Sequence, residues 1–205
     1  MIGTGRVKGR VELMDIIPPF SITVCGIEEL DGHCATGVSH VLSILDPDRA
    51  VPEAFGSFGE HAKLELRFHD VIEADQDGKI APDEGHVAAL LAFGRDLLAG
   101  AAADAHLLVH CHVGISRSTA AMTLILAQAL PEESAERVLA KVLSIREKTW
   151  PNLRMIEIGD AILGRRGTLV AAASGVYRSQ LERFPKVADY MRSTGRQREL
   201  SAAGH

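Results

Sequence analysis

The strongest constraint on the fold is the stretch from Leu107 to Leu130, where two apolar runs are joined by a short loop containing Gly114. The first run (LLVH) is short and rich in Leu and Val, which is typical of a buried strand. The second, Ser118–Leu130, is apolar nearly all round, which is typical of a helix in the middle of a protein. A buried strand that leads directly into a buried helix indicates an α/β protein.

The rest of the chain repeats this alternation. Short runs rich in Val, Ile and Leu predict strands at Ser21–Cys25, Val38–Leu45, Ala62–Phe68 and His106–His110. Apolar residues at helical spacing predict helices around Val87–Leu98, at Ser118–Leu130, Ala135–Thr149 and Met155–Leu163, and within residues 168–193. We therefore predict a central, mostly parallel sheet of about four to five strands with helices on both faces. The last dozen residues are polar, and we expect them to be frayed.

A chain of 205 residues, 46% of them apolar, is long enough to build one well-packed core. We expect an irregular lead-in over residues 1–20, a main α/β domain over 21–166 and a helical C-terminal extension over 167–205. Within the extension, Tyr177, Arg178, Arg183 and Arg192 fit a solvated helix face.

Charge and cysteine content exclude several classes of protein. A net charge of −5 provides no basic field for nucleic acids. No apolar run reaches the ~18 residues of a membrane span, and the N-terminus has no signal-peptide pattern. Three cysteines form no disulfide framework and fit a reducing compartment. We expect a cytoplasmic protein that binds neither nucleic acid nor membrane.

The loop between the two apolar runs has the features of an anion site. It opens the most buried helix, where free backbone amides and the helix dipole attract negative charge. Arg117 can add two parallel hydrogen bonds to phosphate oxygens. The candidate phosphate-binding residues are His112, Val113, Gly114, Ile115, Ser116 and Arg117.

Cys111 begins this loop, and the same field favours its thiolate form. A thiolate beside a cradle for a tetrahedral dianion is equipped for covalent phosphoryl transfer. Ser118 can stabilise the sulfur as a leaving group, and His110 can fix the backbone of Cys111. An inert core cysteine is the commonest alternative for a free cysteine. A metal site of His110, Cys111 and His112 is disfavoured because neighbouring strand residues point to opposite faces.

The pattern His110-Cys111-x5-Arg117-Ser118 resembles the His-Cys-x5-Arg-Ser/Thr signature of the cysteine-dependent protein tyrosine phosphatase superfamily. The loop sequence His-Val-Gly-Ile-Ser is similar to its dual-specificity branch, and the resemblance covers roughly residues 20–165. It implies a hydrolase without cofactor or metal that forms a cysteinyl-phosphate. The substrate would be a phosphorylated protein or a small phosphomonoester.

The resemblance also implies an aspartic acid upstream that protonates the leaving oxygen. Asp70 follows the predicted strand Ala62–Phe68, whose carboxyl end faces the same crevice as Cys111. Asp75 and Asp77 lie on the same loop and compete for this role. The sequence Trp-Pro-Asn at residues 150–152 ends in an amide, which cannot donate a carboxyl proton.

Three alternative interpretations stay open. The acidic stretch at residues 73–84 is close to an EF-hand calcium loop, although Pro82 and the preceding strand depart from that pattern, and an acidic surface loop capped at Asp83 fits it better. A rhodanese-like sulfurtransferase also uses a cysteine loop of this size. A non-catalytic phosphate-binding module would keep the cradle and lack the acid.

Overall fold

The computed structural model describes residues 18–74, 78–100 and 105–205. Four strands form one sheet, and their bounds are β1 (Ser21–Gly26), β2 (His40–Leu45), β3 (Ala62–Arg67) and β4 (His106–Cys111). All neighbouring strands are parallel, in the order β1-β4-β2-β3. The predicted parallel α/β sheet is therefore confirmed, with strand ends that differ from the predicted ones by at most two residues.

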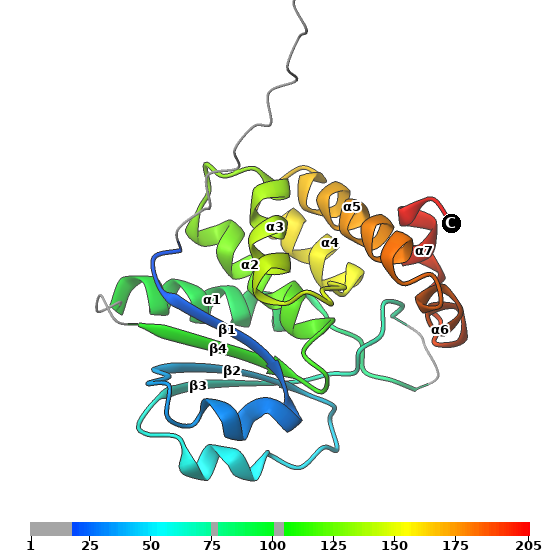
Figure 1. The fold of residues 1–205 in the computed structure, drawn as a ribbon. Coiled ribbons are helices and arrows are strands. Elements are labelled where there is room, and N and C mark those ends of the chain that lie inside the picture. The colour runs from blue at the N-terminus through cyan, green and yellow to red at the C-terminus, as the bar shows by residue number, and fades with distance from the viewer. Residues whose placement is uncertain (1–17, 75–77, 101–104) are drawn as a thin grey trace, which may run out of the picture.

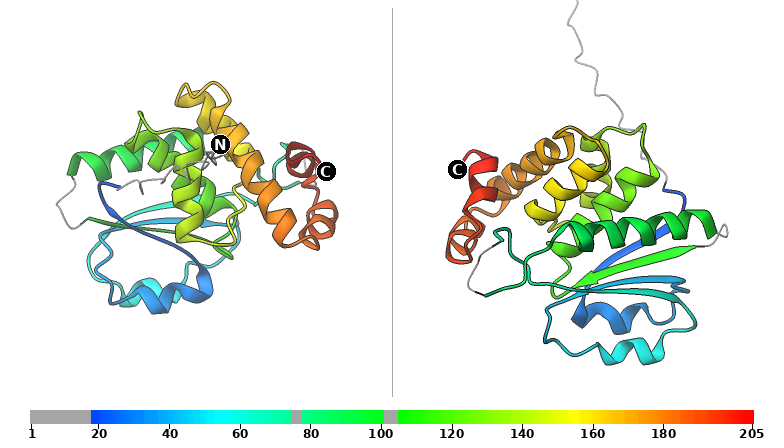
Figure 2. Two further views of the ribbon diagram at one scale, coloured as in Figure 1. Left: turned by 45° about the horizontal axis from the view of Figure 1, so that its top comes forward. Right: turned by 180° about the vertical axis from the view of Figure 1, so that it is seen from behind.

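Helices cover both faces of the sheet, as predicted (Figure 1). On one face lie α1 (Glu84–Gly100), α2 (Arg117–Ala129), α3 (Ala135–Ile145), α4 (Leu153–Ile162) and α5 (Thr168–Arg183). The other face is covered by two short 3-10 helices, η1 (Ile27–His33) and η2 (Glu53–Ser57). The chain ends with α6 (Val187–Ser193) and α7 (Gln197–Ala203), which lie beside α5 in both views of Figure 2.

Parallel strands bring their carboxyl ends to one edge of the sheet. β4 lies between β1 and β2, and Cys111 at its end is in register with Gly26. β2 leads into Asp46 at the same edge, and the chain after β3 leads to Asp70. This edge is where ligands bind in open parallel sheets.

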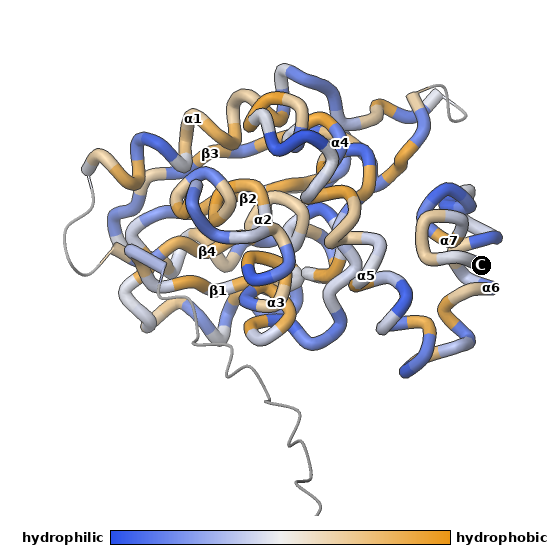
Figure 3. The backbone as a smooth tube through the Cα atoms, turned by 90° about the horizontal axis from the view of Figure 1, so that it is seen from above, coloured by the Kyte–Doolittle hydropathy of each residue, from blue (hydrophilic) through white to orange (hydrophobic). Residues whose placement is uncertain are grey.

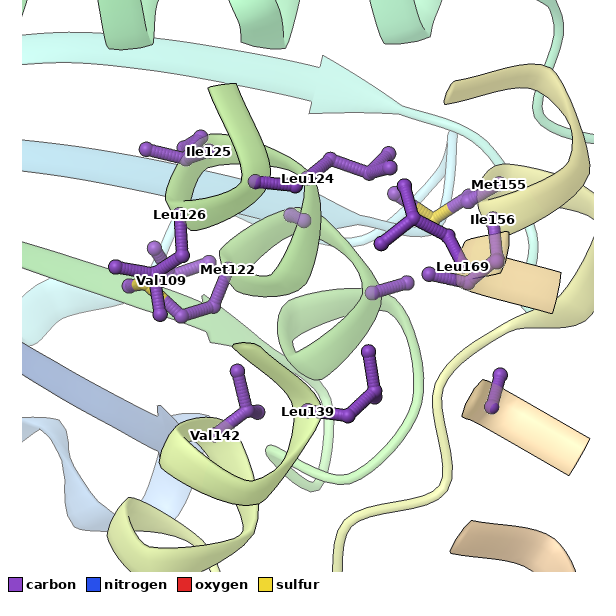
Figure 4. Packing of buried hydrophobic residues seen from close by; sticks show 14 of the residues in the cluster. Val109, Met122, Leu124, Ile125, Leu126, Leu139, Val142, Met155, Ile156 and Leu169 are labelled. Carbon is purple, nitrogen blue, oxygen red and sulfur yellow. The ribbon is translucent and has the colours of Figure 1, made fainter. Parts of the chain in front are cut away.

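The helix α2 is the centre of the main hydrophobic core. Every residue from Arg117 to Ala127 is buried, between β4 and the helices α1, α3 and α4. Figure 4 shows Met122, Leu124 and their neighbours packed against this ring of elements. Gly159 of α4 allows close packing there, because a Cβ at this position would lie 2.2 Å from a methyl carbon of Leu124 and that side chain would have to move.

The C-terminal helices differ from the prediction. The last dozen residues are not frayed, because α7 buries Leu200 and Ala203 in the main core. Tyr177, expected on a solvated face, is fully buried, and its ring stacks on Trp150 at 4.7 Å between centroids. The composition of this region did not indicate its burial. Figure 3 shows that α5 to α7 alternate between hydrophilic and hydrophobic residues, whereas β2 and β4 are mostly hydrophobic. One hydrophobic cluster thus extends from Phe20 to Ala203.

The helix expected at Ala135–Thr149 ends earlier, at Ile145. Arg146 leaves the helical conformation (φ −131°, ψ 99°) and turns back toward the loop after β4. The segment that follows is therefore available to hold that loop. No helix in the described ranges combines the length and apolar character that a membrane span requires.

Candidate active site

The loop from His112 to Ser116 passes very close to the end of β1. Gly114 has a positive φ of 74°, and a Cβ there would lie 2.4 Å from the carbonyl carbon of Cys25. Both facts require glycine, because other residues are strained at this φ and any side chain would overlap the β1 backbone. The amide of Ile27 donates to the carbonyl of His112 at 3.0 Å, which ties the start of the loop to the same strand end.

Each backbone carbonyl of residues 112–116 accepts a hydrogen bond from a donor outside the loop. The donors are Ile27 N to His112 O (3.0 Å), Arg146 Nη2 to Val113 O (2.9 Å), Arg146 Nε to Gly114 O (3.0 Å), Trp150 N to Ile115 O (3.0 Å) and Asn152 N to Ser116 O (3.4 Å). A trans peptide carries its C=O and N–H in opposite directions. Outward carbonyls at 112–116 therefore turn the amides of residues 113–117 toward the inside of the loop, where they form an anion nest.

Arg117 is fixed along one edge of its guanidinium and free along the other. Its side chain is 3% exposed, and Nη1 donates to Asp46 Oδ1 and to the carbonyl of Phe68, both at 2.6 Å. Nε is buried and has no hydrogen-bond partner among the described residues. A buried donor without a partner is costly, and an anion in the loop would satisfy it.

Cys111 lies at the floor of a cavity of about 270 Å³ at this edge of the sheet. Its thiol is almost fully buried, and Sγ lies 3.3 Å from Ser118 Oγ in the first turn of α2. The cavity is lined by Asp70, Cys111, His112, Val113, Ile115, Ser116, Arg117, Trp150, Tyr190, Met191 and Arg196. The structure thus brings the predicted nucleophile, the loop and Arg117 together.

His110 lies behind the cavity and does not line it. Its ring is fully buried against Phe55 of η2 on the other face of the sheet, with Nε2 2.8 Å from Ser43 Oγ of β2. Burial lowers the pKa of His110 to about 4, so the ring is neutral at physiological pH. His110 therefore supports the end of β4 from the far face.

Asp70 lines the same cavity as Cys111 and is held by three side chains. Its Oδ1 accepts from Ser116 Oγ (2.8 Å) and Asn152 Nδ2 (2.9 Å), and its Oδ2 lies 3.1 Å from Arg196 Nη1. Burial alone would raise the pKa of Asp70, but Arg196 and Arg117 outweigh it together with the two hydrogen bonds and lower that pKa. In the ligand-free protein Asp70 is therefore a carboxylate.

Asn152 belongs to the Trp-Pro-Asn sequence at residues 150–152, whose amide cannot serve as the general acid. The structure gives it a different role, since it caps α4 through its Oδ1 and holds Asp70 through its Nδ2. Its backbone amide also binds the loop at Ser116. The sequence pattern alone did not indicate this positioning role.

Arg196 and Arg146 contact residues of the candidate site, and the sequence did not reveal these contacts. Arg196 is 6% exposed, and it contacts Ser116 Oγ (2.9 Å) and the buried carboxylate of Glu199 (2.7 Å) as well as Asp70. Glu199 in turn accepts from Trp150 Nε1 at 2.6 Å. A polar C-terminal stretch gives no sign of such burial, because a buried charge pair has the same composition as an exposed one.

The remaining candidates lie at the margin or beyond it. His112 and Val113 are exposed at the mouth of the cavity. Asp75 and Asp77, the rival acids, lie outside the described residues, as does that part of the 73–84 calcium-loop pattern. Asp83 accepts from the amide of His86 at 2.9 Å and so caps the start of α1, which is the structural role that the sequence favoured for it.

The fold of this chain is similar to that of several solved structures. The chain matches the crystal structure of human DUSP28 with 17% identity and a TM-score of 0.52, over 73% of this chain and 96% of that one. It matches the crystal structure of Tk-PTP in the active form with 17% identity and a TM-score of 0.50, over 71% and 90%. No family model matches the chain, and no curated protein does.

At these identities the likeness concerns the fold. The chain has the fold of the dual-specificity phosphatases, which belong to the cysteine-dependent protein tyrosine phosphatase superfamily. The resemblance to this superfamily that the sequence indicated is thus confirmed for the fold.

Proposed function

We propose that this protein is a phosphomonoester hydrolase that acts through a cysteinyl-phosphate intermediate. The observation that carries the proposal is the surroundings of Cys111 Sγ, which lies at the floor of a cavity bordered by inward-facing amides. Arg117 adds a buried guanidinium edge whose Nε has no protein partner in the described part of the chain. A nucleophile, an oxyanion cradle and a fixed cation thus share one cavity.

In the first step the Cys111 thiolate attacks phosphorus, so that an S–P bond forms and the P–O bond to the leaving group breaks. The loop amides and Arg117 stabilise the three equatorial oxygens. Asp70 donates a proton to the leaving oxygen. Asp70 is ionised before substrate binds, but a phosphate dianion compensates Arg117 and repels the carboxylate, and both effects raise the pKa of Asp70.

In the second step Asp70, now a carboxylate, accepts a proton from a water molecule that attacks the cysteinyl-phosphate. The S–P bond breaks, inorganic phosphate forms and Cys111 leaves as a thiolate. Ser118 Oγ lies 3.3 Å from Sγ and can donate a hydrogen bond to that thiolate. The net reaction consumes one water, and every proton in these steps is moved by a residue of the chain.

The substrate class that we propose is a phosphorylated protein or a small phosphomonoester. The nucleophile must stay a reduced thiolate, because oxidation to higher sulfur acids would end turnover. This requirement fits a reducing compartment, and we propose the cytoplasm.

The test is hydrolysis of p-nitrophenyl phosphate in EDTA and a reductant, by the wild type, Cys111→Ser and Cys34→Ser. Cys34 is a matched control, because it is a free thiol near η2 that does not line the cavity. We expect turnover in the wild type and in Cys34→Ser, and none in Cys111→Ser. No turnover by folded, reduced wild type would overturn the proposal. Persulfide formation from thiosulfate would then indicate a sulfurtransferase, and phosphopeptide binding alone a non-catalytic module.

A further inference from the structure

We call the cavity lined by Cys111 and Arg117 the phosphate site. A second cavity, which is mostly apolar, opens directly beside it. It has a volume of about 300 Å³ and lies between the segment before α4 and the helices α5 and α6. Its apolar walls are Ile115, Trp150, Phe184, Val187, Tyr190 and Met191, and we call this cavity the side pocket.

The side pocket is adjacent to the phosphate site and shares lining residues with it. Ile115, Trp150, Tyr190 and Met191 line both cavities, so one wall separates the position of a bound phosphate from the apolar space. Ile115 belongs to the phosphate loop itself, and its carbonyl is held by Trp150. A molecule whose phosphate enters the loop therefore places its neighbouring atoms at the entrance of the side pocket.

Exposed apolar side chains gather around the same entrance. Tyr190 is 64% exposed and Phe184 37%, and Val113 at the mouth of the phosphate site is 56% exposed. These are three of the six large apolar residues that are exposed in the described part of the chain. Large apolar groups left in water beside a polar site are typical of a surface that is covered when a ligand binds.

We propose that the side pocket binds one large apolar side chain of a phosphopeptide substrate, at a position next to the phosphorylated residue. This inference rests on the phosphatase function proposed above and narrows its substrate class. Residues of α5 and α6 thereby contribute to substrate selection, while the strand edge and the loop supply the reaction.

The size and rim of the side pocket favour a peptide over a lipid. About 300 Å³ is at the lower limit of ligand pockets. It fits one Leu or Phe side chain, whereas the two acyl chains of a phospholipid are far larger. The exposed Lys148 stands at the rim, where it can meet the polar backbone or an acidic neighbour in a peptide.

The experiment compares two phosphotyrosine peptides that differ only in the residues on either side of the phosphotyrosine, Leu in one and Ser in the other. Dissociation constants are measured with Cys111→Ser, and kcat/KM with the wild type. Burial of one large side chain predicts that the Leu peptide binds about tenfold more tightly or better. In the wild type the kcat/KM ratio should favour the Leu peptide by a similar factor.

Two variants connect this preference with the side pocket. Val187→Trp fills the pocket and Phe184→Ala removes part of its wall, and neither residue lines the phosphate site. Both should bring the ratio between the two peptides close to one. Ile162→Ala is the matched control, since Ile162 is an exposed apolar residue of α4 that lines neither cavity. If Val187→Trp does not fold, Phe184→Ala still tests the side pocket, because Phe184 is partly exposed and its removal should be tolerated.

The outcomes separate this inference from the phosphatase proposal. Equal binding of both peptides overturns the inference, and the phosphatase proposal survives if both are hydrolysed. A Leu preference that persists in Val187→Trp and Phe184→Ala also overturns it. If p-nitrophenyl phosphate is not hydrolysed either, the phosphatase proposal fails, and the binding ratio of Cys111→Ser still decides the inference. Faster hydrolysis of a short-chain phosphatidic acid than of either peptide, lost in Phe184→Ala, assigns the side pocket to a lipid and overturns the peptide proposal.

Discussion

Arg196 Nη1 lies 3.1 Å from Asp70 Oδ2, so a residue between α6 and α7 holds a carboxylate that lines the same cavity as Cys111. Burial alone would lower the pKa of Arg196, but the neighbouring carboxylates Asp70 and Glu199 outweigh this and raise it. The guanidinium therefore stays charged at every accessible pH. It links the segment between α6 and α7 to the candidate site through an ion pair, in addition to the apolar packing of these helices.

Replacing Arg196 by Ala should destabilise the protein and change its pH profile. Glu199 would remain as a buried charge without its cation, which costs about 3–5 kcal/mol of the free energy of unfolding. The pKa of Asp70 should rise, because the cation that lowers it is gone, and the alkaline limb of kcat/KM should move to higher pH. Denaturant unfolding and the pH dependence of p-nitrophenyl phosphate hydrolysis measure both effects.

Arg192→Ala is the matched control for that change. The pair of Arg192 and Asp189 is exposed, and its loss should cost less than about 1 kcal/mol. Arg196→Lys keeps the charge and should keep the alkaline limb near that of the wild type. A limb that stays in place in Arg196→Ala would contradict the positioning role, even if stability falls.

Asp70→Asn should have an effect that depends on the leaving group. An amide still accepts hydrogen bonds from Ser116 and Asn152 but cannot donate an acid proton. With phenyl phosphate, whose leaving group needs a proton, we expect kcat/KM to fall about 10²–10⁴-fold. With p-nitrophenyl phosphate, whose leaving group is stable as an anion, the loss should be smaller. The acid role would be refuted by equal losses for both substrates, and Asp83→Asn, at the cap of α1, serves as the control.

Gly114→Ala should disable the loop. The new Cβ would lie 2.4 Å from the Cys25 backbone at a φ of 74°, so either the loop or the end of β1 must move. Non-glycine residues at such φ cost about 1–3 kcal/mol before the overlap is counted. We expect lower thermal stability and loss of phosphate binding, measured by calorimetry. Gly56→Ala has open space around its Cβ and should behave like the wild type. Wild-type phosphate affinity in Gly114→Ala would exclude the described loop geometry.

His110 should make stability depend on acid. Its pKa is 6.5 in a model peptide and about 4 in the fold, a difference that corresponds to about 3 kcal/mol. The unfolded chain binds this proton more readily, so the stabilisation is complete above pH 6.5 and is lost as the pH falls to about 4. Denaturant titrations between pH 4 and 7 should show this loss in the wild type and a flatter profile in His110→Asn. His205→Asn, at an exposed position, should retain the wild-type slope, and an identical slope in His110→Asn would argue against a neutral buried ring.

The parts of the structure that the sequence predicted are those encoded by local patterns. The strand before Cys111, the buried helix after Arg117 and the parallel sheet follow from periodicity and from runs of branched residues. The placement of Asp70 followed from the shared carboxyl edge of parallel strands. Each of these inferences needs only neighbouring residues and a rule of topology.

The residues that escaped prediction act across long separations in the chain. Arg146 binds loop carbonyls 32 and 33 positions away, and Arg196 reaches Ser116 across 80 positions. In a single sequence both are arginines on polar stretches, which normally point into solvent. The sequence gives no sign that Glu199 is buried either. A buried carboxylate is tolerated only because the fold places Arg196 beside it. Polar contacts between residues far apart in the chain are therefore the part of the site that the sequence alone does not predict.

The position of Arg196 has a consequence for the order in which the protein matures during synthesis. During synthesis the N-terminal part of a chain is made first, and a domain folds as a unit. The sheet, the loop and Asp70 are all synthesised before α7, whose Glu199 orients Arg196. A nascent chain therefore contains Cys111, Ser116 and Asn152 before Arg196, the third group that holds Asp70, exists. The contact between Arg196 and Asp70 is supported by Glu199 only after α7 has docked, and a chain that ends before Arg196 leaves Asp70 with its hydrogen bonds from Ser116 and Asn152 alone.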